Sequence, residues 1–211
     1  METKQFTLVG WDPPGYGKSR PPNREIFTEE FCLQKDANLA GLLMSKLGFS
    51  KYSILGWSNG GLTGAYLAAA FPNEVQKLIM CNSPFRMSER SVKVAQMLTH
   101  LENWPPAQQK SLVRTYEKKY LKKMLTDWEQ LNIIGAKDQA CFEVFKVELK
   151  KIKAPTLYIH GGKDILILEE HPIGFQGYIP NFRLHQLPDA PHDHLEFLDE
   201  FVKISQEFLQ L

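Results

Sequence analysis

The order of sequence patterns along this 211-residue chain predicts an α/β fold, with a mainly parallel sheet, helices on both faces and a helical insertion. Short β-rich runs alternate with longer segments of helical periodicity, and strands separated by helices of roughly ten or more residues are typically parallel. Strand patterns are missing between residues 84 and 150, where charged helical segments follow one another. A chain of this length, 43% hydrophobic, can form one domain with a full core.

Three strands and two helices are predicted in the first half of the chain, and several of them end at a residue that interrupts the pattern. Asp12-Pro13-Pro14 ends the first strand, Gly48 ends the first helix and Pro72 ends the second. In chain order, these elements are a strand at 6–11, a helix at 28–47, a strand at 52–55, a helix at 62–71 and a strand at 75–81.

Two further strands and an amphipathic closing helix are predicted after the helical insertion. They occupy residues 154–159, 182–186 and 195–209, respectively. An insertion at the carboxyl ends of parallel strands usually covers a site. The predicted division is therefore a core of residues 1–83 and 151–211, with a helical cap, or lid, of residues 84–150.

The composition excludes several classes of partner. Positive and negative charges nearly cancel, with 25 Lys and Arg against 24 Asp and Glu, so no net field favours DNA, RNA or anionic lipid. No run approaches the roughly 18 apolar residues of a membrane span, and we expect neither a nucleic-acid nor a membrane partner. The three cysteines lack C-x-x-C spacing, which argues against a disulfide scaffold and favours a reducing, intracellular compartment. Four lysines in the insertion are expected to form a solvated helix face: Lys118, Lys119, Lys122 and Lys123.

The pentapeptide Gly56-Trp57-Ser58-Asn59-Gly60 has the G-x-S-x-G pattern of a serine nucleophile. It follows a predicted strand directly and precedes a predicted helix, which is the context that the pattern requires. We expect Ser58 to lie on a strained turn, with Gly56 and Gly60 small so that the backbones can approach. The helix N-terminus favours negative charge, and the Asn59 backbone N–H is expected to be one oxyanion donor.

A serine nucleophile of this kind needs a base and an orienting acid, in the chain order Ser, then Asp or Glu, then His. Asp164 comes just after the predicted strand at 154–159, and His192 lies in the loop before the closing helix. We expect His192 to be the base, with His194, which is closer to the helix start, as the alternative. The other histidines are expected to have polar or packing roles: His100, His160, His171 and His185.

Metal and nucleotide sites are not expected, and neither is a cofactor. His192-Asp193-His194 is a local cluster of ligand-type side chains, but no dispersed ligand set supports a zinc site. The string Gly15-Tyr16-Gly17-Lys18-Ser19 is similar to the end of a P-loop. A P-loop needs its first glycine where this chain has Asp12, so ATP binding is rejected.

Several strings of the sequence occur together in one known family. They are Trp11-Asp12-Pro13, Gly15-Tyr16-Gly17, Ser19-Arg20-Pro21-Pro22, Leu55-Gly56-Trp57-Ser58, Gly60-Gly61, His160-Gly161-Gly162-Lys163-Asp164 and the closing helix. On these strings the chain resembles the valacyclovir-hydrolase (biphenyl hydrolase-like) branch of the α/β-hydrolases. The resemblance implies an α/β-hydrolase fold and a carboxylic-ester hydrolase without a cofactor. It also implies that Ser58 is the nucleophile, Asp164 the orienting acid and His192 the general base.

The residue after the expected nucleophile departs from the family pattern. The resemblance places an Asp there, thought to receive the α-ammonium group of amino-acid esters, whereas this chain has Asn59. An amide keeps a hydrogen bond but gives up the charge, and a charged hydrogen bond in a dry pocket contributes about 1.5–3 kcal/mol. We therefore expect Asn59 to contact substrate and the preference for amino-acid esters to be weaker.

The chain also begins late relative to the family, which normally supplies three strands before the one predicted at 6–11. The resemblance thus predicts an N-terminally truncated fold with an open sheet edge, lacking the loop that carries the second oxyanion N–H. Loss of one oxyanion donor lowers the rate about 10²–10³-fold.

The sequence is compatible with two functions. The favoured one is a serine esterase that acts on a small-molecule ester through an acyl-enzyme. The alternative is a catalytically impaired hydrolase-like fragment or isoform with a binding role, which self-associates through the open sheet edge. The family resemblance is also compatible with a mitochondrial location, which the sequence itself does not indicate.

Overall fold

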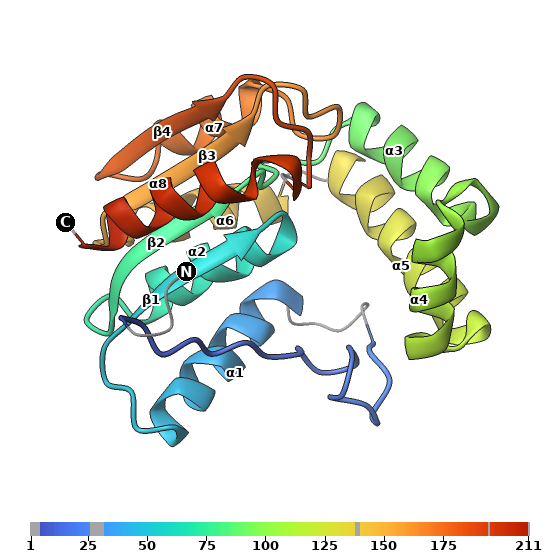
Figure 1. Cartoon of the computed structure of the whole chain (residues 1–211), viewed down its shortest axis with the longest axis horizontal. Coiled ribbons are helices and arrows are strands. Elements are labelled where there is room, and N and C mark those ends of the chain that lie inside the picture. Colours follow the sequence, from blue (N-terminus) through green and yellow to red (C-terminus); the bar gives the residue numbers. More distant parts are fainter. Residues whose placement is uncertain (1–4, 26–31, 138–139, 194, 211) are drawn as a thin grey trace. The chain divides into compact units, whose positions relative to one another are not determined.

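The computed structural model describes residues 5–25, 32–137, 140–193 and 195–210 (Figure 1). The chain divides into two compact units. The first consists of Met1–Gly10, Glu30–Phe85 and Val144–Leu211, and the second of Trp11–Glu29 and Arg86–Glu143. The first unit carries the sheet and the second carries most of the helical insertion.

The first unit is built on a parallel sheet of four strands in the order β1-β2-β3-β4. The strands are β1 (Tyr52–Trp57), β2 (Val75–Cys81), β3 (Thr156–Gly161) and β4 (Phe182–Leu187). The prediction of a mainly parallel sheet is therefore confirmed. Trp57 pairs with Cys81 at the ends of β1 and β2, and Gly161 pairs with Leu187 at the ends of β3 and β4. All four carboxyl ends consequently lie along one edge of the sheet.

Helices cover both faces of this sheet, as predicted (Figure 1). They are α1 (Cys32–Lys46), α2 (Asn59–Ala70), α6 (Ala140–Leu149), α7 (Glu170–Gln176) and α8 (Leu198–Gln210). Phe208 of α8 belongs to the same buried cluster as Ile79, whereas Gly64 of α2 lies against Leu78. Successive side chains of a strand point to opposite faces, so α2 and α8 pack on opposite sides of β2.

The second unit is helical and includes the loop that follows Trp11. Its helices are α3 (Glu89–Thr99), α4 (Pro106–Tyr116) and α5 (Lys118–Lys137). The Tyr120 hydroxyl donates to Gly15 O and accepts from the Arg24 N–H, both at 2.8 Å, and the Tyr116 hydroxyl accepts from the Gly17 N–H at 3.1 Å. These bonds join the loop to α4 and α5, although the loop lies in the segment predicted for the core. That the helices cap a site stays a prediction.

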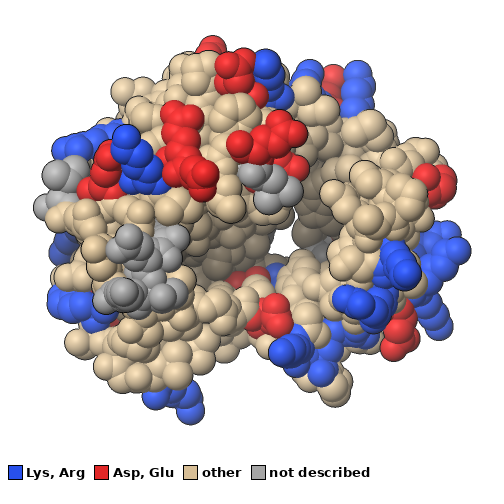
Figure 2. Space-filling view, viewed as in Figure 1, with Lys and Arg blue, Asp and Glu red and all other residues tan. Residues whose placement is uncertain are grey.

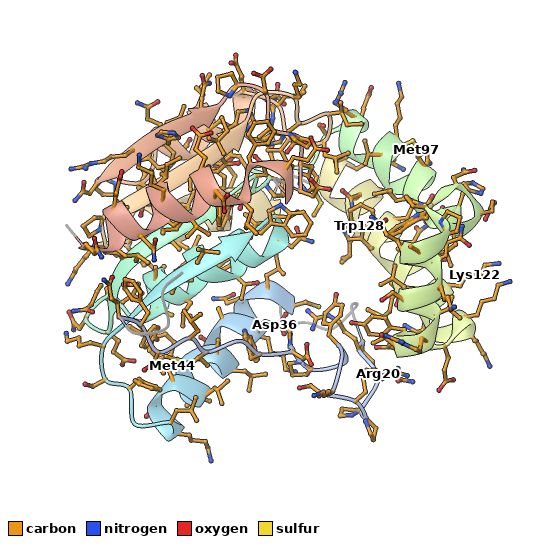
Figure 3. All side chains as sticks on the ribbon, in the orientation of Figure 1. Arg20, Asp36, Met44, Met97, Lys122 and Trp128 are labelled. Carbon is orange, nitrogen blue, oxygen red and sulfur yellow. The ribbon has the colours of Figure 1, made fainter. Side chains whose placement is uncertain are left out.

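The four lysines of α5 form a solvated face, as expected from the sequence. All four are exposed, and Lys122 points outward from the helix (Figure 3). Lys123 forms an ion pair with Asp127 one turn along the same helix. Basic side chains are prominent over the helices of the second unit, while acidic and basic side chains are interspersed around α8 (Figure 2). No helix among the described residues is long and apolar enough to cross a membrane.

The prediction of a strand at residues 6–11 is wrong, because these residues have no regular secondary structure. A strand needs a partner, and the sheet ends at β1 on this side. Leu8 and Val9 are consequently 57% and 39% exposed, and Leu55 and Trp57 of β1 are 42% and 48% exposed. The short helix α7, which comprises seven residues, was not predicted either, because its pattern is too brief to show helical periodicity.

The turn between β1 and α2 is held by close backbone approach. A Cβ atom at Gly56 would lie 2.3 Å from Gly60 O, and one at Gly61 would lie 1.9 Å from Ser83 Oγ. A Cβ at Gly60 would meet nothing within 4 Å. The expectation that Gly60 itself must be small is therefore wrong. Gly56 approaches the backbone of Gly60 closely, but a side chain at position 60 would face open space.

This asymmetry predicts different effects for two matched substitutions. Gly56→Ala should lower the free energy of unfolding by about 1–3 kcal/mol, because the new methyl group overlaps backbone that cannot rotate away. Gly60→Ala should change it by no more than about 0.5 kcal/mol. Urea unfolding followed by circular dichroism measures both, and equal losses in the two variants would contradict this account of the turn.

Candidate active site

Ser58 lies at the turn between β1 and α2 in an uncommon backbone conformation. Its φ is 54° and its ψ is −124°, a region that non-glycine residues rarely adopt and that costs about 1–3 kcal/mol. The Ser58 N–H donates to Cys81 O of the neighbouring strand at 2.8 Å, which holds the turn in place. Asn59, the first residue of α2, is exposed beside it. The strained turn expected from the G-x-S-x-G pattern is present.

The structure brings Asp164 and His192 into direct contact. His192 Nδ1 lies 2.7 Å from Asp164 Oδ2, and the Asp164 side chain is fully buried. The other carboxylate oxygen, Oδ1, accepts from the Leu166 N–H at 2.7 Å and from the Ile167 N–H at 2.9 Å. Three hydrogen bonds thus fix the carboxylate. An imidazole that donates from Nδ1 to a carboxylate keeps Nε2 available to accept a proton.

Two residues for which the sequence predicts no such role hold the backbone of His192. The Trp57 indole N–H donates to His192 O at 2.8 Å, and the Asn82 side-chain amide donates to the same oxygen at 3.0 Å. The Trp57 and His192 rings are 4.9 Å apart, centroid to centroid, and inclined at 50°. A usable signal existed for Asn82, which is a polar residue directly after a buried strand.

Ser58 is linked to the Asp164–His192 pair through its neighbour Trp57. Among the hydrogen bonds of the described residues, none joins Ser58 Oγ to His192. Such bonds are often long in unliganded enzymes and tighten when substrate binds. His194, the alternative base, lies outside the described residues.

The remaining candidate side chains have other surroundings. His160 is almost fully buried, and this burial lowers the pKa of its imidazole despite the carboxylates of Asp164 and Glu169. His171 Nδ1 accepts from the Phe85 N–H at 2.9 Å, which is a packing role. The Cys81 thiol next to the Ser58 turn is no competing nucleophile, because burial, and then Asp164, raise its pKa to about 12.

The loop similar to a P-loop is filled by its own carboxylate. The Lys18 N–H donates to Asp12 Oδ2 at 2.8 Å, and a Cβ at Gly17 would lie 2.3 Å from the same oxygen. A phosphate entering this turn would meet a negative charge, which supports the rejection of a nucleotide site. Among the described residues, no group of three or more His, Cys, Asp or Glu side chains could hold a metal ion.

Comparison with known proteins shows the family of the chain. A family model described as alpha/beta hydrolase fold matches residues 2–114. The serine hydrolase BPHL of Mus musculus is 35% identical over 211 residues, which covers all of this chain and 72% of that protein. The Homo sapiens protein of the same name is 32% identical over the same extent.

Solved structures show the same fold. A hydrolase from Pseudomonas aeruginosa superimposes with a TM-score of 0.64 at 23% identity, covering 95% of this chain and 78% of that one. An enol-lactonase from Burkholderia xenovorans gives a TM-score of 0.64 at 22% identity, covering 95% and 79%. The named relatives support a hydrolase function. Because the family model matches more than half of the chain and the identity to serine hydrolase BPHL extends over all of this chain, the chain belongs to the α/β-hydrolase family, in the branch of serine hydrolase BPHL.

Proposed function

We propose that this hydrolase is a serine carboxylic-ester hydrolase that works through an acyl-enzyme. The observation that carries the proposal is the hydrogen bond of 2.7 Å between His192 Nδ1 and the buried Asp164 carboxylate. This pair lies beside Trp57, the residue directly before Ser58. Ser58 itself is half-buried on a strained turn at the start of a helix.

In the proposed reaction Ser58 Oγ attacks the carbonyl carbon of the ester, while His192 Nε2 takes the hydroxyl proton. The tetrahedral intermediate collapses, the bond between the carbonyl carbon and the alkoxide oxygen breaks, and His192 returns the proton to the departing alcohol. Water, deprotonated by the same imidazole, then attacks the acyl-Ser58 ester. The bond between the acyl carbon and Ser58 Oγ breaks, His192 returns the proton to Ser58 Oγ, and the acid leaves. Asp164 keeps the proton on Nδ1 and stabilises the imidazolium that forms in each half of the reaction.

Negative charge on the carbonyl oxygen would be stabilised at the N-terminus of α2. The proposed donor there is the Asn59 backbone N–H, whose position at the start of a helix of 12 residues adds the helix dipole. No metal or cofactor takes part in the proposed mechanism.

The Asn59 side chain affects which esters the proposed enzyme accepts. It is exposed beside Ser58, and it supplies an amide where the family pattern has a carboxylate. An amide can accept a hydrogen bond from an ammonium group but cannot pair with its charge. We therefore propose that uncharged esters are accepted about as well as amino-acid esters.

A second candidate is a binding role, in which a second copy of the chain covers the edge of the sheet at β1. The exposure of Leu55 and Trp57, 42% and 48%, favours it, because neighbouring apolar side chains at a sheet edge promote association.

Localisation inside the cell, with a mitochondrial location allowed by the family resemblance, is likewise a proposal.

Labelling with a fluorophosphonate probe tests the nucleophile and its base. Ser58→Ala should abolish labelling, and Asp164→Asn should lower ester hydrolysis by roughly 10³–10⁴-fold because the imidazole adopts the wrong tautomer. His192→Ala should also remove labelling. Ser53→Ala and His185→Ala are matched controls outside the site, and labelling that survives Ser58→Ala would refute the proposed nucleophile.

The role of Asn59 is tested with valine and isovalerate esters of one alcohol, which differ by the α-ammonium group. The wild-type protein should show less than about tenfold preference for the valine ester. Asn59→Asp should raise that preference about 10–100-fold, since a charged hydrogen bond contributes about 1.5–3 kcal/mol. A strong wild-type preference for the valine ester would show that the missing charge is not decisive.

Self-association is tested by sedimentation velocity over a range of concentrations. If β1 pairs with a second copy, Leu55→Glu should return the protein to monomer, because it places a charge in the contact. Leu42→Glu on α1 is a matched control, since Leu42 is 56% exposed. A wild-type protein that is monomeric at all concentrations would rule out this role.

A further inference from the structure

We infer that Trp57 and Asn82 are positioning residues that hold the His192 backbone so that its imidazole stays against Asp164, oriented to serve Ser58 as base. This inference rests on the proposed function, because it concerns the orientation of the proposed base. It assigns a role to the second residue of the G-x-S-x-G string and to the residue that follows β2.

Both side chains act on a single atom. The Trp57 indole N–H and the Asn82 amide donate to His192 O at 2.8 and 3.0 Å, and the Asn82 amide also lies 3.3 Å from Pro191 O. Two donors that reach one carbonyl oxygen from the ends of two neighbouring strands fix its position. The imidazole of His192 is then held at two ends, by its backbone and by the bond of 2.7 Å from Nδ1 to Asp164 Oδ2.

Asn82 is itself held firmly by the sheet. It is fully buried, its φ is 42°, and its backbone N–H donates to Ile159 O at 3.1 Å. Its side-chain oxygen accepts from the Gly161 N–H at 2.8 Å, and Gly161 O in turn accepts from the Asp164 N–H at 3.0 Å. One amide therefore connects the loop that carries the base with the turn that carries the acid.

Trp57 connects the base to the nucleophile. It directly precedes Ser58, and its ring packs 4.9 Å from the His192 ring. A displacement of about 1 Å in a reacting group can lower the rate about 10²-fold. Because Trp57 is 48% exposed, its indole N–H contributes little to the core. Its removal should disturb the position of the base far more than the stability of the fold.

The first test compares two tryptophan substitutions with the same chemical change. Trp57→Phe removes the donor to His192 O and keeps an aromatic ring. Trp104→Phe removes a similar bond, from the Trp104 indole N–H to Leu98 O at 2.9 Å, in the helical unit. For hydrolysis of a p-nitrophenyl ester, Trp57→Phe should lower kcat about tenfold with KM unchanged, whereas Trp104→Phe should leave both near wild type.

The second test uses Asn82→Asp, which keeps the acceptor for the Gly161 N–H and suits a positive φ. It removes the side-chain N–H groups that donate to His192 O and Pro191 O, and it places a carboxylate oxygen against these two carbonyl oxygens. The kcat should fall about 10²-fold. Circular dichroism melting identifies any loss of fold in this variant, and Trp57→Phe tests the inference independently of it.

A readout that does not depend on activity separates this inference from the proposed function. The ring ¹⁵N shifts of His192, measured at about pH 8, report which nitrogen carries the proton. Nδ1–H should predominate in wild type and in Trp104→Phe, and the Nε2–H tautomer should appear in Trp57→Phe.

If the fluorophosphonate probe does not label the wild-type protein, the esterase function is contradicted. The ¹⁵N shifts of His192 would still test whether Trp57 positions the imidazole. Trp57→Phe with wild-type kcat and wild-type shifts would overturn the inference. A rise in KM alone would also overturn it, because it would make Trp57 a substrate contact.

Discussion

The parallel alignment of four strands is the constraint on which the candidate site depends. Each strand ends at the same edge and places there the residues of the turn or loop after it: Ser58 after β1, Asn82 after β2, Asp164 shortly after β3 and His192 after β4. The ladder hydrogen bonds fix the register, so side chains far apart in sequence meet at hydrogen-bond distance. Trp57 and His192, 135 positions apart, are joined in this way. A shift of one residue in any strand would break these contacts.

Much of this arrangement could be predicted from the sequence, because the signals are local. The strand at 75–81 has the predicted bounds, since a β-rich apolar run there is bounded by polar residues and turns. The φ of 54° at Ser58 follows from a glycine-flanked serine between a strand and a helix. Chain order, together with the position of each residue after a predicted strand, paired Asp164 with His192. Their side chains lie 2.7 Å apart, although their chemical roles stay a proposal.

Other features could not be predicted, because they depend on neighbours distant in the sequence. The apolar run at 6–11 has the composition of a strand, but no strand pairs with it in the described sheet. The direction in which a Cβ at position 60 would point depends on the helix geometry, which the five-residue pattern does not contain. Asn82 looks like an ordinary turn residue until β3 and the loop of His192 are placed around it.

The division of the chain has a consequence for how the helical unit is attached. The chain passes from one unit to the other at Gly10–Trp11, Glu29–Glu30, Phe85–Arg86 and Glu143–Val144. The hydroxyl of Tyr120 binds residues on both sides of the loop, so the loop and α5 form one piece. Three of these crossings, at 29–30, 85–86 and 143–144, connect this unit to the segments that carry the sheet and its helices, whereas a simple insertion has two such connections. A proteolytic nick at any one of these three would leave two covalent connections, and the helices would stay attached to the sheet.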